Sequence, residues 1–176
     1  MLDRPETKNA ISALKTPTDL EADSVKAITK SINGLVADAF ALYLKTKNFH
    51  WHLSGPNFRD FHIMLDEQAE QIYASIDPLA ERVRKLGGST IKSISHISEL
   101  QSLEDNNADF VGPLAMLNEL LTDNNKVAAA MRKAHKICDD NEDSATASLL
   151  EIYLDETERR VWFLFESSKA SDSSGH

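Results

Sequence analysis

Four long stretches of this sequence carry apolar residues at three- and four-residue steps, which is the period of an amphipathic helix. The stretches cover about residues 23–52, 57–86, 107–138 and 143–167. The turn formers Ser54-Gly55-Pro56 close the first stretch and Gly87-Gly88 close the second, while no segment shows the alternation of a hairpin strand. We therefore expect an all-α fold in which four helices pack as a bundle.

The link between the second and third stretches is long, about residues 88–106, and contains a short helical pattern near residues 95–101. Neighbouring antiparallel helices need only a short loop, so a link of this length predicts a crossover along the bundle. The expected fold is thus a ferritin-like four-helix bundle with a short extra helix in the long crossover between helices two and three. We expect Asn57 to cap the second helix and Pro113 to lie in the first turns of the third.

The fourth helix is expected to bury an apolar side, which consists of Leu149, Leu150, Ile152, Tyr153, Val161, Trp162 and Leu164. Polar segments flank the bundle at both ends of the chain. We expect a mobile tail over residues 1–18, a bundle domain over residues 19–167 and a flexible tail over residues 168–176.

Length and composition narrow the class of protein. A chain of 176 residues, 41% of them hydrophobic, can bury one core, and its single cysteine, Cys138, excludes an internal disulfide framework. The first residues show no targeting signal, and the longest apolar run, residues 34–44, is too short to span a membrane. These features predict a cytoplasmic protein. The net charge of −9 argues against a surface that grips nucleic-acid backbones.

The second helical stretch carries an unusual set of potential metal ligands. His62 and Asp66 are four residues apart, and so are Asp77 and Glu81. The eleven residues from Asp66 to Asp77 correspond to about 1100° of helical rotation, so all four side chains fall on one stripe. Imidazole and carboxylate ligands of this kind suit Fe²⁺, Mn²⁺ or Zn²⁺.

These two pairs are too far apart to share one metal ion within a straight helix. Asp66 and Asp77 are separated by about 16 Å of helix rise, whereas metal–ligand bonds are about 2 Å long. Either the pairs serve different sites, or an antiparallel second copy of the chain brings its carboxylate pair beside the first pair. Asp77 also precedes Pro78, so a break of the helix with Asp77 as a cap is an alternative. A di-iron site inside the bundle is disfavoured, because the sequence has no Glu-x-x-His motif.

A more specific pattern is spread over four segments. They read Lys47-Asn48-Phe49-His50-Trp51-His52-Leu53-Ser54-Gly55-Pro56-Asn57-Phe58, Phe61-His62-Ile63-Met64-Leu65-Asp66-Glu67-Gln68, Asp77-Pro78-Leu79-Ala80-Glu81-Arg82 and Leu86-Gly87-Gly88. Together they resemble the Dps family of mini-ferritins, and the resemblance extends over about residues 24–165. It implies a ferroxidase centre at a two-fold interface, with one subunit supplying His50, His62 and Asp66 and its neighbour supplying Asp77 and Glu81. His50 enters through the resemblance alone.

The resemblance also implies an assembly and an activity. It indicates a homododecamer that forms a hollow shell and acts as a ferroxidase, an oxidoreductase whose substrates are Fe(II) and hydrogen peroxide. Two iron ions are expected at each centre, with Zn or Mn as alternative occupants, and ferric mineral is expected inside the shell. Consuming peroxide in this way would protect DNA and the cell from oxidative damage.

The alternative function is that of a nucleoid-compacting DNA-binding protein whose metal sites are mainly structural. Family members that bind DNA directly carry basic tails, whereas the side-chain charges of residues 1–18 sum to only +1. We therefore expect direct DNA binding to be weak or absent. Two further features of the sequence are open to more than one interpretation. His52 is an additional ligand, a group that supports a ligand from behind, or a helix-end residue that packs near Trp51. The acidic residues 139–143 either cap the fourth helix or, by resemblance, line a pore for iron entry.

Overall fold

The computed structural model describes residues 14–169, and within this range the chain forms five helices and no strand. The helices are α2 (Ala22–His52), α3 (Phe58–Lys85), α4 (Ile94–Leu100), α5 (Pro113–Asp140) and α6 (Ser144–Ser168). The four long helices confirm the expected all-α bundle, and α4 confirms the short helix in the crossover.

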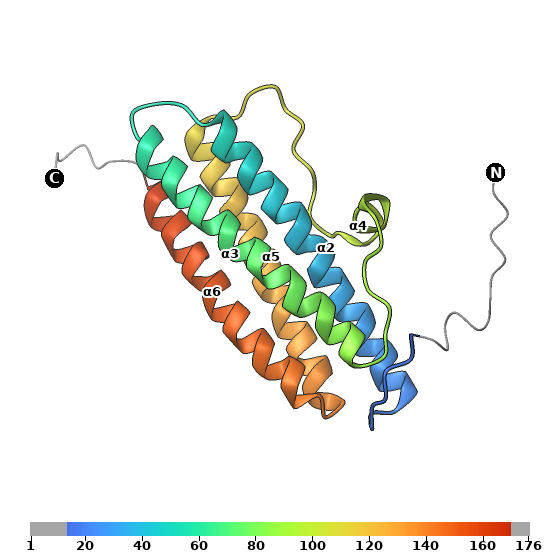
Figure 1. Ribbon diagram of the computed structural model, residues 1–176. Helices are drawn as coiled ribbons and strands as arrows, with labels where there is room; N and C mark the ends of the chain where they lie inside the picture. The colour runs from blue at the N-terminus through green and yellow to red at the C-terminus, as the bar shows by residue number, and fades with distance from the viewer. Residues whose placement is uncertain (1–13, 170–176) are drawn as a thin grey trace, which may run out of the picture.

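The connectivity is that of a ferritin-like bundle. Figure 1 shows α2 and α3 as one antiparallel hairpin and α5 and α6 as a second hairpin packed beside it. The crossover starts at the C-terminal end of α3, returns along α2 with α4 packed against that helix, and reaches the start of α5. As a result, α5 begins at the end of the bundle where α2 ends, and the turn between α2 and α3 lies at that same end.

Local sequence signals account for most helix ends. Pro113 occupies the first turn of α5, where its missing N–H is not needed, and the Asp143 carboxylate caps α6 by accepting a hydrogen bond from the Thr146 N–H at 3.1 Å. Gly87, with φ of 85°, adopts the left-handed conformation that ends α3. One expectation is wrong. The third helix begins at Pro113 and not near residue 107, because a proline disfavours helix in the residue before it. Asn57 occupies the N-cap position of α3 as expected, but its side chain makes no capping hydrogen bond.

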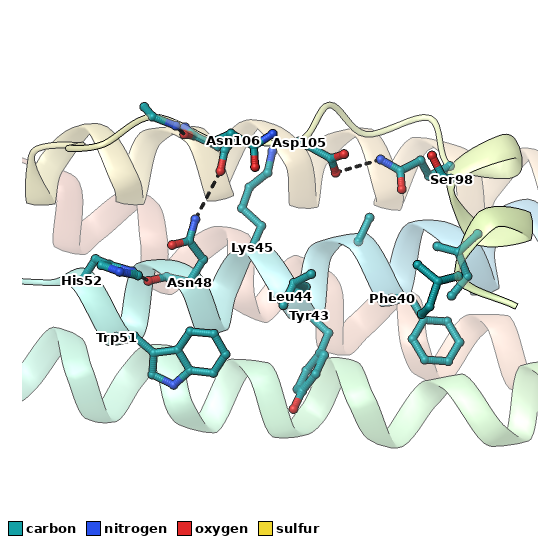
Figure 2. A pocket seen from close by; sticks show the side chains of 16 residues that line it. Phe40, Tyr43, Leu44, Lys45, Asn48, Trp51, His52, Ser98, Asp105 and Asn106 are labelled. Carbon is teal, nitrogen blue, oxygen red and sulfur yellow. Dashed lines mark hydrogen bonds between the residues drawn. The ribbon is translucent and has the colours of Figure 1, made fainter.

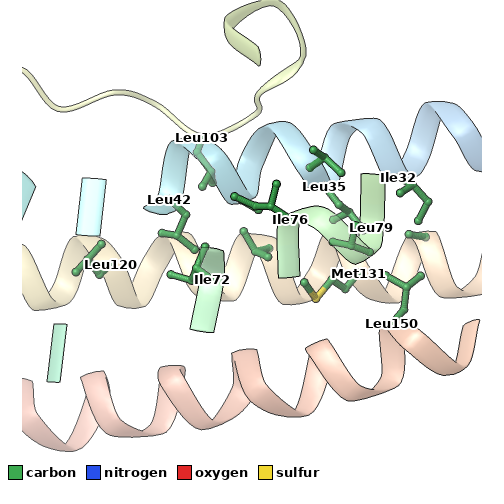
Figure 3. Close-up of a cluster of buried hydrophobic side chains, with 14 of the residues drawn as sticks. Ile32, Leu35, Leu42, Ile72, Ile76, Leu79, Leu103, Leu120, Met131 and Leu150 are labelled. Atoms are coloured by element: carbon green, nitrogen blue, oxygen red, sulfur yellow. The ribbon is translucent and has the colours of Figure 1, made fainter. Parts of the chain in front are cut away.

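A continuous apolar core runs along the inside of the bundle. Its largest fully buried side chains come from all four long helices and include Phe49, Leu65, Leu117 and Leu164. Figure 3 shows part of this core, where side chains from α2, α3, α5 and α6 meet and Leu103 of the crossover adds to them. The core fixes α2 against α3, and that hairpin positions the candidate metal ligands.

The fourth long helix does not bury all the residues expected of it. Ile152 and Trp162 are exposed, Trp162 by 61% of its surface, whereas Leu150 and Leu164 are buried. Each exposed residue lies two positions from its buried counterpart, which is about 200° of helical rotation. One helix face cannot include both members of such a pair, so the expectation that Ile152 and Trp162 belong to the core is wrong.

A buried carboxylate attaches the crossover to α2. Asp38 accepts hydrogen bonds from the backbone N–H groups of Ser102 at 2.6 Å and Leu103 at 3.2 Å, and from the Ser102 hydroxyl at 2.7 Å. Asp38 interrupts the most apolar run of the sequence, and these three donors satisfy its charge inside the fold. The crossover is therefore held along α2 by specific bonds.

The segment before α2 also makes defined contacts. The Thr16 hydroxyl donates to the Arg84 carbonyl oxygen at 2.8 Å, and the Arg84 guanidinium donates to the Leu14 carbonyl oxygen at 2.6 Å. Residues 1–13 and 170–176, which belong to the expected tails, lie outside the described range. No helix within residues 14–169 has the length and apolar character needed to cross a membrane.

Candidate metal centre

His50 and His62 form a reciprocal pair at the turn between α2 and α3. His50 Nδ1 lies 2.9 Å from the His62 carbonyl oxygen, and His62 Nδ1 lies 3.0 Å from the His50 carbonyl oxygen. Their rings are stacked, with centroids 3.7 Å apart. Because a carbonyl oxygen can only accept, each Nδ1 carries a hydrogen, and the neutral form of each ring has its lone pair on Nε2. Metal-binding histidines are commonly oriented by a backbone hydrogen bond of this kind.

Asp66 lies beside this pair, one helical turn after His62. Its Oδ1 is 3.9 Å from His50 Nε2 and forms an ion pair with the Lys47 ammonium. The hydrogen bond from Lys47 is the main cause that lowers the pKa of Asp66, and the same bond raises the pKa of Lys47. The carboxylate is therefore ionised at neutral pH, with a cation already beside it. A metal ion bound by Asp66 has to compete with Lys47.

An aromatic ring covers the other face of this group. Phe58, the first residue of α3, stacks on His62 with ring centroids 4.9 Å apart. The three rings of Phe58, His62 and His50 thus form one stack, which limits rotation of both imidazoles. Such preorganisation reduces the ordering cost of binding a metal ion.

Asp77 and Glu81 lie farther along the same face of α3, and both are exposed. The Glu81 carboxylate forms an exposed ion pair with Lys85 at 3.0 Å. Helix α3 continues without a break from Phe58 to Lys85, so the alternative in which Asp77 caps a new helix before Pro78 is wrong. The separation of about 16 Å along the helix between Asp66 and Asp77 therefore stands.

The structure thus brings some of the predicted ligands together and keeps the others at a distance. His50, His62 and Asp66 come together, whereas Asp77 and Glu81 do not join them within one chain. Within residues 14–169, no group of three or more His, Cys, Asp or Glu side chains is arranged to hold a metal ion. Within one chain, His50, His62 and Asp66 are therefore neighbours at the turn between α2 and α3, while Asp77 and Glu81 lie farther along α3.

Sequence analysis missed Lys47. Lys47 lies three positions before His50 on α2, so the two side chains share a helix face. This spacing could have identified Lys47 as a neighbour of the candidate ligands. The stacked geometry of the two histidines has no comparable sequence signal, because it depends on the packing of α2 against α3.

His52 does not join the other two histidines. It is the last residue of α2, and its Nδ1 lies 2.8 Å from the Asn48 carbonyl oxygen. Together with Trp51 it lines a groove of about 740 Å³ between α2 and the crossover (Figure 2). On the crossover side of this groove the Asn48 amide donates to the Asn106 carbonyl oxygen at 3.3 Å. His52 is thus an exposed residue at the end of α2, about 200° around that helix from His50.

The bundle interior holds two buried cations, Lys45 and Arg160. The Lys45 ammonium lies 2.7 Å from Asp123 and 3.0 Å from Glu119. The Arg160 guanidinium donates to the Asn124 side-chain oxygen at 3.0 Å, and burial lowers the pKa of Arg160 to about 10, which still leaves it charged. Both buried cations are thus satisfied by polar partners inside the bundle.

The acidic residues at the end of α5 and the start of α6 have separate partners. Asp143 is buried, caps α6 and forms an ion pair with Arg82 at 2.8 Å. Asp140 pairs with Lys136, and Asp139 lies 3.4 Å from His135. These contacts confirm the helix-capping interpretation for Asp143. A role of this region in iron entry stays a prediction.

Comparisons with known proteins agree with the fold. The model of the ferritin-like domain family matches residues 29–167. The chain is 32% identical over 133 residues to the DNA protection during starvation protein of Brevibacillus brevis, covering 76% of this chain and 89% of the relative. It is 31% identical over 140 residues to an uncharacterized low temperature-induced protein of Nostoc sp., covering 79% of this chain and 78% of the relative.

Solved structures show the same architecture. DpsC from Streptomyces coelicolor superposes with a TM-score of 0.86 at 26% sequence identity, over 90% of this chain and 92% of the other. A ferritin-like four-helix bundle is the class that these observations define. Within that class, the chain belongs to the Dps family.

Proposed function

We propose that this chain is the subunit of a ferroxidase that oxidises Fe(II), preferably with hydrogen peroxide, and stores ferric mineral inside a hollow shell of twelve copies. The proposal places each reaction site between two subunits. His50, His62 and Asp66 come from one subunit, and Asp77 and Glu81 come from its neighbour. The observation that carries the proposal is the reciprocal histidine pair, because it leaves two free Nε2 atoms next to an ionised aspartate on an exposed face.

The proposed chemistry consumes peroxide without leaving a radical. Two Fe²⁺ ions each supply one electron to one H₂O₂, and two protons complete the reaction to two Fe³⁺ and two H₂O. The imidazoles of His50 and His62 bind iron through Nε2, and the carboxylates balance the additional charge of Fe³⁺. When iron binds to Asp66, the Lys47 ammonium is displaced from that carboxylate.

Iron oxidation and storage provide the direct test. The protein is loaded anaerobically with Fe²⁺, stoichiometric peroxide is added, and iron is followed through size-exclusion chromatography. Rapid oxidation with iron eluting in a large assembly is expected, and both should be lost in His62→Ala. Glu67→Ala is the matched control, because Glu67 is an exposed carboxylate about 100° around α3 from Asp66. Slow oxidation with precipitated iron in the unaltered protein would contradict the proposal and favour a structural site or another metal.

A mixing experiment tests whether the sites are shared. One variant combines His62→Ala with Asp66→Ala, a second combines Asp77→Ala with Glu81→Ala, and each alone should lack ferroxidase activity. Equal amounts are dissociated and reassembled together. Half of the dimers are then mixed, and each mixed dimer has one intact site, so about a quarter of the activity should return. A site built within one chain would recover nothing.

Direct DNA binding is proposed to be weak at physiological salt. Each chain has a formal charge of −9, so a twelve-subunit shell is strongly anionic and repels the phosphate backbone. A gel-shift titration with supercoiled DNA at moderate salt should show no stable complex. Stoichiometric condensation of the DNA would instead support the nucleoid-compacting function.

A further inference from the structure

The exposed stripe of α3 has an internal symmetry. Its side chains follow one another at intervals of four, four, three, four and four residues: His62, Asp66, Glu70, Tyr73, Asp77 and Glu81. These intervals keep all six within an arc of about 100°, and each side chain is exposed or half-exposed. Because the intervals read the same from either end, two antiparallel copies of the stripe can align residue against residue.

The shared site of the proposed function requires this antiparallel alignment of the two stripes, so the inference rests on the proposed function. A site that combines Asp66 with Asp77 of the partner subunit needs a two-fold axis midway between positions 66 and 77. The same axis lies midway between His62 and Glu81, and midway between Glu70 and Tyr73. It passes between positions 71 and 72 of α3. Tyr73 is then within about 2 Å of helix rise of the axis.

Tyr73 is paired with a second tyrosine from α2. The Tyr43 and Tyr73 rings have centroids 5.1 Å apart and planes inclined by 44°. Figure 2 shows Tyr43 pointing from α2 toward α3. Two copies of the chain therefore place four tyrosine rings around the axis. The two metal sites lie on either side, each about 11 Å of helix rise from it.

This tyrosine pair is adjacent to both halves of the site. Tyr43 is one helical turn before Lys47, whose ammonium contacts Asp66. Tyr73 is one turn before Asp77 on the stripe itself. Tyrosine is also scarce in the chain, which has only three, and the third, Tyr153, lies on α6 in the other hairpin.

We infer that the two Tyr43–Tyr73 pairs carry an electron between the two metal sites of a dimer. Peroxide takes up two electrons, but a site that holds a single Fe²⁺ can supply only one. Reduction by one electron alone breaks the O–O bond and releases a hydroxyl radical. A phenol within reach supplies the missing electron and proton, and a second iron at the other site then restores the phenol.

The steps balance in atoms and charge. At the first site Fe²⁺, H₂O₂, one proton and a tyrosine phenol give Fe³⁺, two H₂O and a neutral tyrosyl radical. The tyrosyl radical then takes one electron from Fe²⁺ at the second site and one proton, giving Fe³⁺ and the phenol. The sum is two Fe²⁺, one H₂O₂ and two protons converted to two Fe³⁺ and two H₂O. The tyrosines thus make two half-filled sites behave as one filled site.

The test compares half-loaded with fully loaded protein. The unaltered protein and the double variant Tyr43→Phe with Tyr73→Phe are loaded anaerobically with one Fe²⁺ per site, and limiting peroxide is added. The unaltered protein should form two Fe³⁺ per peroxide and a transient tyrosyl signal in freeze-quenched electron paramagnetic resonance. The variant should fall toward one Fe³⁺ per peroxide, lose the tyrosyl signal and form more hydroxyl spin-trap adduct. Tyr153→Phe is the matched control and should behave like the unaltered protein.

Full loading separates this inference from the proposed function. With two Fe²⁺ per site, both electrons come from iron, so the unaltered protein and the tyrosine double variant should oxidise iron alike. If fully loaded protein fails to oxidise iron, the proposed function fails. If full loading is normal but the double variant matches the unaltered protein at half loading, the electron transfer is refuted and the ferroxidase proposal stands. A radical signal that persists in the double variant and disappears on replacing Trp51 would also refute it.

Discussion

The buried ion pair between α2 and α5 offers a quantitative test of how the bundle is held together. The Lys45 ammonium contacts Asp123 at 2.7 Å, and the two side chains are only 6% and 4% exposed. Burial alone would lower the pKa of Lys45, but hydrogen bonds to Asp123 and Glu119 outweigh burial and raise the pKa. The lysine is therefore charged, and Lys45→Met removes the cation while nearly preserving the volume.

The expected loss of stability follows from the Asp123 carboxylate, which Lys45→Met leaves buried without its partner. Removing one partner of a buried ion pair costs about 3–5 kcal/mol. The lower end applies here, because Lys126 lies 3.7 Å from the other Asp123 oxygen and Glu119 is partly exposed. For a chain of this length about 3 kcal/mol corresponds to a fall of about 6–12 °C in Tm. Replacing Asp123 by Leu in the same chain removes the unpaired charge and should recover more than half of the loss.

The assay is thermal unfolding followed by circular dichroism at one protein concentration, since assembly also shifts Tm. The matched control is Lys136→Met, which breaks an exposed pair with Asp140 and should lower Tm by less than about 2 °C. Equal Tm values for Lys45→Met and Lys136→Met would refute the assignment of the buried pair as a structural contact. A double variant with Asp123→Leu that is less stable than Lys45→Met would show that packing, and not charge, determines the loss.

Three further predictions concern single side chains. Lys47→Met removes the ammonium that competes with a metal ion for the Asp66 carboxylate. Because this ion pair is partly exposed and contributes about 0–1 kcal/mol, calorimetry should show Zn²⁺ binding up to about fivefold more tightly to the variant. Weaker binding would mean that Lys47 positions the carboxylate. Burial raises the pKa of Cys138 to about 12, so a thiol reagent at pH 8 should label the native chain more than about a hundredfold more slowly than the unfolded chain. Because this folded pKa lies above the unfolded value of about 8.5, the contribution of Cys138 to stability is full below that pH and declines as the pH rises toward 12. Gly88→Ala would place Cβ 2.3 Å from the Thr29 hydroxyl oxygen. We expect this clash to cost about 2 kcal/mol of stability and to lower Tm by about 4–8 °C. In the control Gly34→Ala the new Cβ has no atom within 4 Å, so Tm should be unchanged or higher.

The helices could be predicted closely because their ends are encoded locally. The Ser54-Gly55-Pro56 turn and the Gly87-Gly88 pair limit α3, and the structure ends that helix at Lys85. The start of α5 was misplaced because periodic apolar residues continue before Pro113 without forming helix. Trp162 was misassigned for a different reason. Hydrophobicity identifies residues that can be buried, but only the neighbours of a helix decide which of its faces is covered.

The candidate site likewise has one part that could be predicted from local sequence and another part that depends on helix packing. His62, Asp66, Asp77 and Glu81 could be proposed as candidate ligands from sequence because a regular helix converts spacing into direction, and one unbroken helix carries all four. His50 lies on another helix, so periodicity could not place it, and only the resemblance to a family suggested it. Its hydrogen bond to the His62 backbone, the reciprocal bond from His62 and the contact of Lys47 with Asp66 arise when α2 packs against α3. Sequence alone thus determined the candidate ligand types and the stripe, because these depend on local geometry. The tertiary structure decided which of these side chains meet and which ring nitrogen of each histidine faces the backbone, because both depend on contacts between separate helices.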